Sequence, residues 1–373
     1  MKKLYYIVKS NLHYYPPCVS QIRMLHDLGA DVTVLYGSSE RSALDLLDQE
    51  GIPYCQLADD RGRLPGKLDK ISNWLTFRRA LKQYLRSVDQ SNAVLWFGTA
   101  ESLLPMSGAL NGWQYIASFL ELLDQQKGKL RALRPMAQKA STVTTCEETR
   151  SYLMQYWFGL KRLPYTIPNK PYNVPCERGS DVTTEAGKKI LEATKGHPYV
   201  IYQGIFQNPE YMTALAQVLH DHYPEMFLVL MGIDKYHIAD QVKKIHANTV
   251  VSGYIPAPLH LQVTANAHIG VLYYKPDELN KAFCAPNKIF EYSYFGLPII
   301  GNDIPGLKNT IGKAGAGVCI DFSYESVLHA LQTIEEKYER ISKNAVAFYH
   351  SVDNVATIRK IAAENQLIRE ECQ

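Results

Sequence analysis

Short apolar runs alternate with stretches of helical periodicity along almost the whole chain, and this alternation limits its fold more than any other feature. In the first half, the runs with strand character are Leu4–Val8, Asp31–Tyr36, Ala93–Phe97, Gln114–Ala117 and Thr142–Thr145. The helical stretches between them include Ser20–Leu28, Ile71–Arg86 and Glu147–Trp157. Strands that alternate with helices form a parallel sheet with helices on both faces. The sequence therefore predicts an α/β protein.

The alternation breaks between residues 164 and 175, where four prolines indicate a linker or hinge. A second series follows, with strands expected at Tyr199–Gln203, Phe227–Met231, Val250–Ser252, Ile269–Tyr273, Pro298–Gly301 and Val318–Ile320. A length of 373 residues suits two domains. We expect one doubly wound domain in residues 1–170 and another in 171–352. A last helix is expected from Asn354 to Glu371.

Composition excludes several classes of protein. No apolar run approaches the ~18–20 residues that a membrane-spanning helix needs. The seven cysteines include no Cys-x-x-Cys pair, so we expect neither a zinc site nor a disulfide framework, and a cytoplasmic location fits. The pI near 8.3 lies below the range of nucleic-acid-binding domains, and no motif for nucleic acid is present. Charge is uneven, because residues 1–170 hold 22 Lys and Arg against 15 Asp and Glu.

The stretch 286–306 has the signals of a short helix followed by a strand. Pro286 suits the first turn of a helix and Gly296 the left-handed residue just after its end. A short apolar strand follows, and a turn at Asn302 and Asp303 ends it. The start of the helix offers backbone N–H groups and a positive dipole end, which together attract an anion.

Lys288 and Glu291 are three residues apart and therefore project from one face of that helix. The cation can meet a phosphate, and the carboxylate can hold sugar hydroxyls. Spacing alone also fits an ordinary capped helix that carries a surface ion pair.

The run Pro286–Tyr292 followed by Gly296–Ile300 resembles the donor-site signature of the family 4-type retaining glycosyltransferases, the glycosyl transferases group 1. This resemblance implies the GT-B fold, in which two Rossmann-like domains face a cleft and a C-terminal helix, here within 353–373, crosses back to the first domain. It also implies that Glu291 holds the ribose of a nucleotide sugar and that Lys288 and the helix start face the diphosphate. The adjoining donor-binding residues would be Ala285, Pro286 and Asn287.

Two further segments resemble the family more weakly. Gly253-Tyr254-Ile255 matches the turn that holds the nucleobase, which assigns Tyr254 and Ile255 to the donor site, although a plain strand-to-helix turn fits equally well. Gln203-Gly204-Ile205 matches the loop that faces the diphosphate and the donor sugar, which adds Gly204 and Ile205.

The chain also departs from the family pattern. Residues 205–218 contain no Lys or Arg, although relatives usually place two diphosphate-binding cations there. Phe283 stands where many relatives have a glutamate that holds the donor sugar. We therefore expect an altered contact with the donor sugar at Phe283.

In the first half, candidate acceptor-side residues follow two expected strands. The loop after the first strand has no glycine, and its Asn11, His13 and Tyr14 could contact a sugar, although an uninvolved loop histidine fits His13 equally well. Glu121 matches one position of a family segment, as an acceptor-side or structural residue. No metal site is expected, since His220 and His222 have no third ligand nearby in the sequence.

The segment from Arg61 to Arg86 mixes basic residues with Trp74, Leu75, Phe77 and Leu81. A basic amphipathic segment can lie on an anionic membrane surface. An ordinary domain helix with a solvated basic face explains the same pattern.

The resemblance implies a metal-independent enzyme without a cofactor. It would move a hexose, with retention, from a nucleotide sugar such as a UDP-sugar to a glycan or lipid-linked acceptor. This reaction would belong to bacterial surface polysaccharide synthesis, at the inner face of the membrane. Two alternatives stay open: a non-catalytic partner subunit with this fold, and a nucleotide-sugar epimerase.

Overall fold

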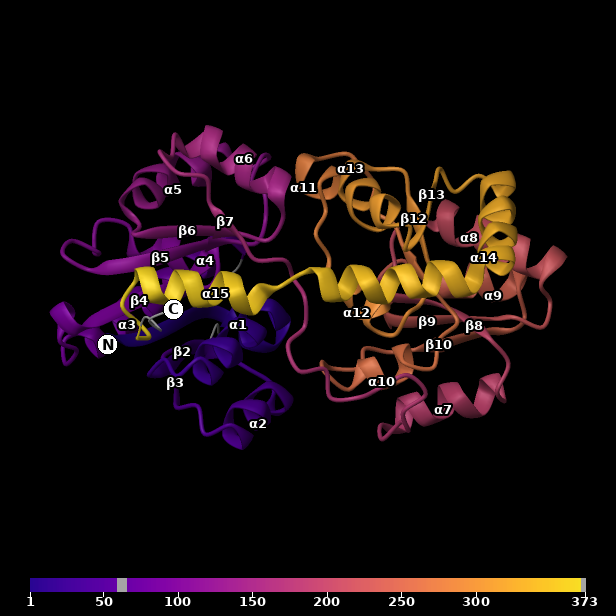
Figure 1. The fold of residues 1–373 in the computed structure, drawn as a ribbon, viewed down its shortest axis with the longest axis horizontal. Coiled ribbons are helices and arrows are strands. Elements are labelled where there is room, and N and C mark those ends of the chain that lie inside the picture. The colour runs from indigo at the N-terminus through magenta and orange to yellow at the C-terminus, as the bar shows by residue number, and fades with distance from the viewer. Residues whose placement is uncertain (59–65, 370–373) are drawn as a thin grey trace. The chain divides into compact units, whose positions relative to one another are not determined.

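The computed structural model describes residues 1–58 and 66–369. The chain forms two compact units. Unit 1 consists of Met1–Tyr172 together with Asp353–Gln373, and unit 2 is Asn173–Val352. Each unit is built on one parallel β-sheet with helices on both faces (Figure 1).

The described part of unit 1 contains a seven-stranded sheet in the order β3-β2-β1-β4-β5-β6-β7. Its strands are β1 (Lys3–Asn11), β2 (Val32–Ser38), β3 (Tyr54–Gln56), β4 (Ala93–Phe97), β5 (Gln114–Phe119), β6 (Thr142–Thr145) and β7 (Tyr165–Thr166). Its helices are α1 (Pro16–Asp27), α2 (Arg41–Gln49), α3 (Gly66–Leu85), α4 (Ala100–Leu103), α5 (Lys127–Lys139), α6 (Glu148–Phe158) and α15 (Asn354–Glu364). Three short 3₁₀ turns are η1 (Leu12–Tyr14), η2 (Gln90–Asn92) and η3 (Leu104–Met106).

The centre of unit 1 is buried on both faces of its sheet, as the near-continuous apolar runs of β1 and β4 predict. Two large aromatic side chains, Tyr6 and Trp96, stack there with ring centroids 5.6 Å apart. Each has a polar partner: the Tyr6 hydroxyl donates to Gln21, and the Trp96 indole N–H donates to the Ser118 hydroxyl at 2.8 Å. The core therefore buries these polar atoms without leaving them unpaired.

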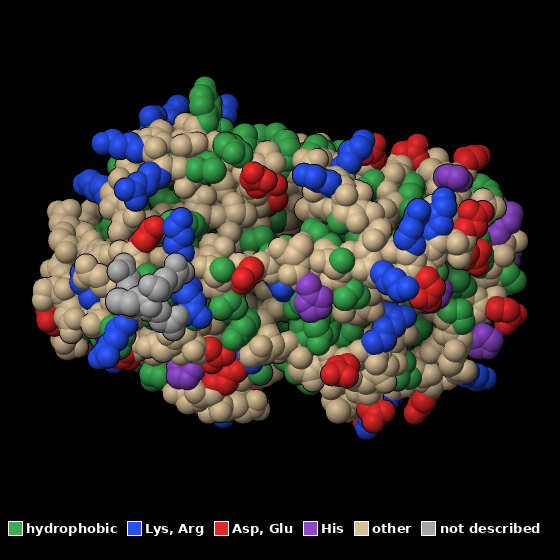
Figure 2. Space-filling model, viewed as in Figure 1, with side chains coloured by type: hydrophobic (Ala, Val, Ile, Leu, Met, Phe, Trp, Pro, Cys, Tyr) green, Lys and Arg blue, Asp and Glu red, His purple; other side chains and the backbone are tan. Residues whose placement is uncertain are grey.

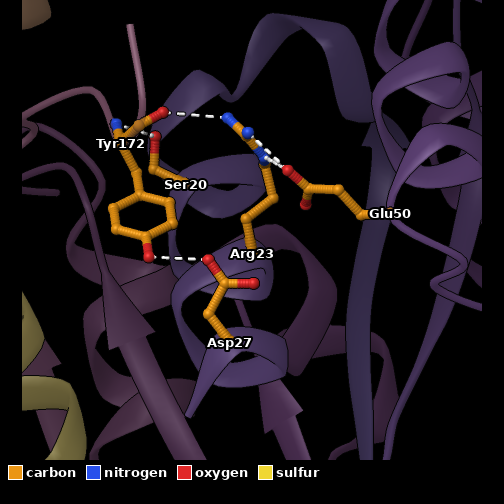
Figure 3. Close-up of polar contacts among 5 residues, drawn as sticks. All are labelled: Ser20, Arg23, Asp27, Glu50 and Tyr172. Atoms are coloured by element: carbon orange, nitrogen blue, oxygen red, sulfur yellow. Dashed lines mark hydrogen bonds and ion pairs between the residues drawn. The ribbon is translucent and has the colours of Figure 1, made fainter. Parts of the chain in front are cut away.

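Polar contacts fasten the two parts of the chain that border unit 2, the segment ending at Tyr172 and the segment beginning at Asp353, to the rest of unit 1. Tyr172 is fastened to α1, because its hydroxyl donates to Asp27 at 2.7 Å and its carbonyl accepts from Arg23 at 2.9 Å (Figure 3). The helix α15 packs on α1 (Figure 1). Just after α15, the amide of Asn365 donates to the Thr142 hydroxyl of β6 at 3.0 Å. The C-terminal segment is thus an integral part of unit 1.

The sheet of unit 2 has the order β10-β9-β8-β11-β12-β13. Its strands are β8 (Tyr199–Ile205), β9 (Phe227–Ile233), β10 (Thr249–Ser252), β11 (Ile269–Leu272), β12 (Ile299–Asn302) and β13 (Gly317–Ile320). Its helices are α7 (Glu185–Thr194), α8 (Pro209–His222), α9 (Ile238–Ile245), α10 (His260–Thr264), α11 (Leu279–Ala282), α12 (Asn287–Tyr294), α13 (Pro305–Leu307) and α14 (Tyr324–Ser351), with a π-helical turn η4 (Lys308–Gly312).

A glycine in the sheet sets the position of α12. Gly270 lies on the central strand β11, and a Cβ there would come within 2.3 Å of the Tyr292 ring. The missing side chain lets Tyr292 of α12 lie flat on the sheet, fully buried. This contact places the first turn of α12 at the carboxyl edge of the sheet.

The predicted α/β fold with two parallel sheets is confirmed, and the structure corrects several details of the prediction. Asn302 lies in β12 rather than in a turn, because it pairs in register with Ile320 of β13. Pro286 caps α12 from outside rather than joining its first turn, whereas Gly296 does adopt the left-handed conformation that ends the helix. The last helix ends at Glu364, and its predicted end at Glu371 lies outside the described residues. Among the described residues, no helix is long and apolar enough to cross a membrane.

Candidate functional site

The carboxyl edge of the unit 2 sheet is the natural place for a ligand. In a doubly wound sheet, ligands bind where the strand order reverses, outside the carboxyl ends of the central strands. In unit 2 the order reverses between β8 and β11. Gln203, Gly204 and Ile205 end β8, and α12 begins at the same edge because Tyr292 packs on β11.

Glu291 of α12 is the centre of a buried polar network at this edge. Glu291 is only 6% exposed to solvent. One carboxylate oxygen accepts from the Gln203 amide at 2.5 Å and lies 3.4 Å from His260 Nε2. The side-chain amide oxygen of Gln203 (Oε1) in turn accepts from the Thr264 hydroxyl at 2.8 Å. Three side chains from β8 and α10 therefore fix the orientation of one carboxylate.

The network also decides the charge of Glu291. Burial by itself raises the pKa of this carboxyl, but His260, Lys288 and the hydrogen bond from Gln203 outweigh it and hold the pKa below its ordinary value. Glu291 is therefore an ionised acceptor at neutral pH, and such a group binds hydroxyl donors strongly.

Lys288 lies one turn before Glu291 and extends over Gly204 at the end of β8. Its Nζ is 3.4 Å from the place that a Cβ of Gly204 would occupy. Burial lowers the pKa of Lys288, and the charge of Glu291 partly opposes this effect. A partly buried ammonium group next to backbone that carries no side chain is well placed to meet an anion.

The loop that follows β8 is held by two stacked tyrosines. The Tyr202 hydroxyl donates to the carbonyl of Ile205 at 2.8 Å, and the Tyr273 hydroxyl donates to that of Gln207 at 2.5 Å. Their rings lie 4.8 Å apart and nearly parallel. The loop is thus fixed by side chains beneath it, and Lys288 brings a cation to it from another element.

The chain is similar to known proteins in structure but not detectably in sequence. No protein-family model matches the chain, and no curated protein is significantly similar to it in sequence. The structure of HepE from Anabaena in complex with UDP and glucose is 16% identical, with a TM-score of 0.68 over 98% of this chain and 99% of that one. Sucrose-phosphate synthase from Thermosynechococcus elongatus is 14% identical, with a TM-score of 0.68 over 98% of both chains. A glycosyltransferase from Rickettsia africae is 13% identical, with a TM-score of 0.63 over 100% of both. The fold is GT-B.

Two glycines shape the edge of the unit 2 sheet where β8 and β9 end side by side. Gly204 and Gly232 are partners in the register of these strands, with φ of 133° and 146°. A Cβ on Gly232 would lie 1.8 Å from the carbonyl oxygen of Gly204. Only a glycine at position 232 lets the backbone of Gly204 approach β9 this closely, and this backbone is the part of β8 over which Lys288 extends.

Replacing Gly232 with alanine is therefore expected to displace the end of β8 and to lower the free energy of unfolding by at least about 2 kcal/mol. Thermal and urea unfolding measure this loss. Gly253 provides the matched control, since its φ is not left-handed and a Cβ there meets nothing within 4 Å. Equal stability of G232A and G253A would contradict the role of the close approach.

The other predicted donor-binding residues lie in two loops of unit 2. Tyr254 and Ile255 follow β10, and Tyr254 is exposed while Ile255 is buried in the core. The loop before α12 contains Phe283, Ala285 and Pro286, and Asn287 is the first residue of α12; all four are partly buried. Thus the structure brings Lys288, Glu291 and Gly204 together, whereas Tyr254 and Ile255 belong to the loop that leads into α10.

The sequence did not indicate a role for His260 or Thr264. Gln203 was matched to the loop that faces the diphosphate, but its contact with Glu291 was not predicted. Gln203 lies 88 positions from Glu291 in the sequence, so their contact depends on the tertiary fold. One local signal was present: His260 and Thr264 are four residues apart and therefore share a face of α10.

The predicted acceptor-side residues lie in unit 1. Asn11 at the end of β1 is hydrogen-bonded to the Ser38 hydroxyl. His13 is buried, and its Nδ1 accepts from the backbone N–H of Glu40 at 2.9 Å. Burial lowers the pKa of His13, although the charge of Glu40 acts against this. Because Glu40 caps α2, His13 has a clear structural task.

Tyr14 and Glu121 are more accessible. Tyr14 is exposed, with its ring 4.2 Å from that of His13. Burial, assisted by the charge of Glu121, raises the pKa of Tyr15 to about 12, so Glu121 belongs to the same region as η1. The ends of β1 and β5 thus bring Asn11, Tyr14 and Glu121 to one edge of the unit 1 sheet.

In the described part of the chain, no group of three or more His, Cys, Asp or Glu side chains could hold a metal ion. His222 pairs with the Tyr324 hydroxyl at 2.9 Å on the surface of unit 2.

Proposed function

We propose that this protein is a glycosyltransferase that binds a nucleotide sugar at the carboxyl edge of the unit 2 sheet. The observation that carries this proposal is the buried, ionised Glu291 held by Gln203 and His260, with Lys288 beside it over Gly204. A fixed carboxylate suits a pair of adjacent hydroxyls, and a cation at a helix start suits a diphosphate. The complexes of HepE with UDP and with UDP-glucose support a UDP-linked donor.

Each part of the donor then has its own partner. The Glu291 carboxylate accepts hydrogen bonds from the two ribose hydroxyls, and Lys288 with the first turn of α12 neutralises the diphosphate. The end of β8 at Gly204 and Ile205 faces the diphosphate and sugar, and the backbone at Tyr254 and Ile255 holds the base. The loop from Phe283 to Pro286, together with Asn287 at the start of α12, closes the site beside the sugar.

The proposed reaction is transfer of a hexose with retention. The bond between the sugar C1 and the oxygen of the β-phosphate breaks, and a bond from C1 to the acceptor oxygen forms. The leaving phosphate takes the proton of the acceptor hydroxyl on the same face of the sugar. The protein contributes positioning and charge stabilisation, and Lys288 and α12 stabilise the leaving diphosphate without a metal ion or cofactor.

We propose a glycan or lipid-linked saccharide as the acceptor, in bacterial surface polysaccharide synthesis at the inner face of the membrane. Asn11, Tyr14 and Glu121 would contact it, and His13 would hold their loop. The edge of the unit 1 sheet carries these residues, which fits a second substrate site.

Incubating the protein with UDP-, GDP- and dTDP-sugars tests the proposal by mass spectrometry. We expect UDP release from a UDP-hexose, accelerated by a lipid-linked saccharide fraction, and NMR of the product should give the anomeric configuration of the donor. Conversion of the sugar without any acceptor would instead indicate an epimerase. Binding of no nucleotide sugar would favour a non-catalytic partner subunit.

The lowered pKa of Lys288 predicts a pH dependence of donor binding. As pH rises, the free protein loses the Lys288 proton below the ordinary lysine value of 10.5, so the affinity for UDP should begin to fall before that pH. In K288R the fall should be shallower, because the guanidinium group stays protonated. Ionisation of the nucleotide itself affects both proteins equally, so a difference between their pH profiles of UDP affinity reports on residue 288. Identical profiles would show that Lys288 does not meet the diphosphate.

A further inference from the structure

The solvent-facing side of α3 combines apolar and cationic side chains in one continuous row. The row consists of Leu68, Ile71, Leu75, Arg79, Lys82 and, just after the helix, Arg86. Successive members are three or four residues apart, so they share one face of the helix. We call this row the α3 stripe.

All members of the α3 stripe are exposed, and its first half is apolar. Leu68, Ile71 and Leu75 are 61%, 53% and 48% exposed. The second half is purely cationic and contains no carboxylate. Exposed aliphatic side chains three in a row are uncommon on a free surface, and they mark an interaction site.

The stripe is not needed to hold α3 in place, because the opposite side of the helix does this. Phe77, Leu81 and Leu85 of that side are buried. The Trp74 indole N–H donates to Glu101 at 3.2 Å, and Arg78 donates to the carbonyl of Pro105 at 2.6 Å. The α3 stripe is therefore an outer face on a firmly attached helix.

Neighbouring helices extend the cationic surface. The connections through α3, α5 and α6 cross the sheet in one direction, and right-handed crossovers place such helices on the same face. On α5, Lys127, Arg131 and Arg134 are exposed, and the helix has no acidic residue. On α6, Tyr152 and Tyr156 are exposed. Figure 2 shows Lys and Arg side chains gathered over α5, with hydrophobic side chains beside them over α6.

We propose that this face of unit 1 docks on an anionic lipid surface. The aliphatic half of the α3 stripe would enter the boundary between headgroups and acyl chains, and the cations of α3 and α5 would meet anionic headgroups. Tyrosines are favoured at the same depth of a bilayer. A nucleic acid or an acidic protein would match the cations but not Leu68, Ile71 and Leu75. This inference goes beyond the transfer reaction and does not depend on it.

Flotation of the full chain with lipid vesicles tests the inference. We expect binding to vesicles of equal parts phosphatidylcholine and phosphatidylglycerol, weakened by salt, and little binding to phosphatidylcholine alone. The variant R79Q/K82Q/R86Q should bind roughly a hundredfold less tightly. The variant L68Q/I71Q/L75Q should lose at least about tenfold, because the cations alone then hold the protein.

The matched control is K189Q/K243Q/K244Q, which removes three exposed lysines of unit 2. It should bind vesicles like the unaltered protein. The inference is overturned if the protein ignores phosphatidylglycerol at low salt, if either stripe variant binds normally, or if the control loses as much as the stripe variants. Vesicle binding needs no nucleotide sugar, so its failure is distinct from a failure of donor binding.

Discussion

Replacing Glu291 with alanine is expected to weaken the binding of UDP-glucose at least about a hundredfold. Two ribose hydroxyls would lose a charged acceptor, and each such hydrogen bond contributes about 1.5–3 kcal/mol. Equilibrium dialysis with labelled UDP-glucose measures the loss. The E291Q variant keeps the shape of the side chain but not its charge, and its affinity for UDP-glucose should fall between those of the unaltered protein and E291A.

Stability must be followed in the same variants, since Glu291 also accepts from Gln203. Its removal leaves a buried amide without its partner, which costs about 1–3 kcal/mol of unfolding free energy. Glu185 on α7 is a suitable control. Its carboxylate is exposed, and the ion pair described for it is with the surface residue Lys188 at 3.4 Å. Donor affinity of E291A equal to that of E185A would exclude Glu291 from the donor site.

Replacing Lys288 with methionine is expected to lower the rate of sugar transfer by roughly 10²–10³-fold, the usual effect of removing one group that stabilises charge in the transition state. The effect should be large because residues 205–218 offer no lysine or arginine to share the task. Steady-state rates of UDP release measure it. Methionine keeps most of the side-chain volume, and because burial lowers the pKa of Lys288, the variant should be no less stable than the parent.

Lys281 provides the control for this experiment. It lies nearby in the sequence, on α11, and pairs with Asp277 at 2.9 Å. If transfer depends on a specific cation at Gly204, K281M should keep the parental rate. Equal losses in K281M and K288M would mean that only the general positive charge of this region matters.

The sequence was sufficient for the fold because the periodicity of its elements agrees with their burial. The strands β4 and β6 have the predicted boundaries. The strand β4 is a fully buried apolar run, and β6 consists of β-branched Thr and Val residues, which favour strands. The short strands β3 and β7 were missed. They have three and two residues, too few for a periodic signal, and β7 lies within a proline-rich stretch that favoured a linker.

The site was only partly predictable for a related reason. Lys288 and Glu291 share one helix, so their spacing is a local property that the sequence displays. The partners of Glu291 come from β8 and α10, and their side chains meet it only because the strand order of unit 2 brings these elements to one edge. The structural task of His13 likewise depends on a contact with Glu40, 27 positions away.

Calorimetric titration of UDP and UDP-glucose into the unaltered protein tests the central claim most directly. The buried carboxylate at Glu291 and the cation at Lys288 predict one site per chain for each ligand, with binding lost in the double variant E291A/K288M. Absence of binding to UDP and UDP-glucose, or unchanged binding in the double variant, would contradict the claim that this edge of unit 2 is a nucleotide-sugar site.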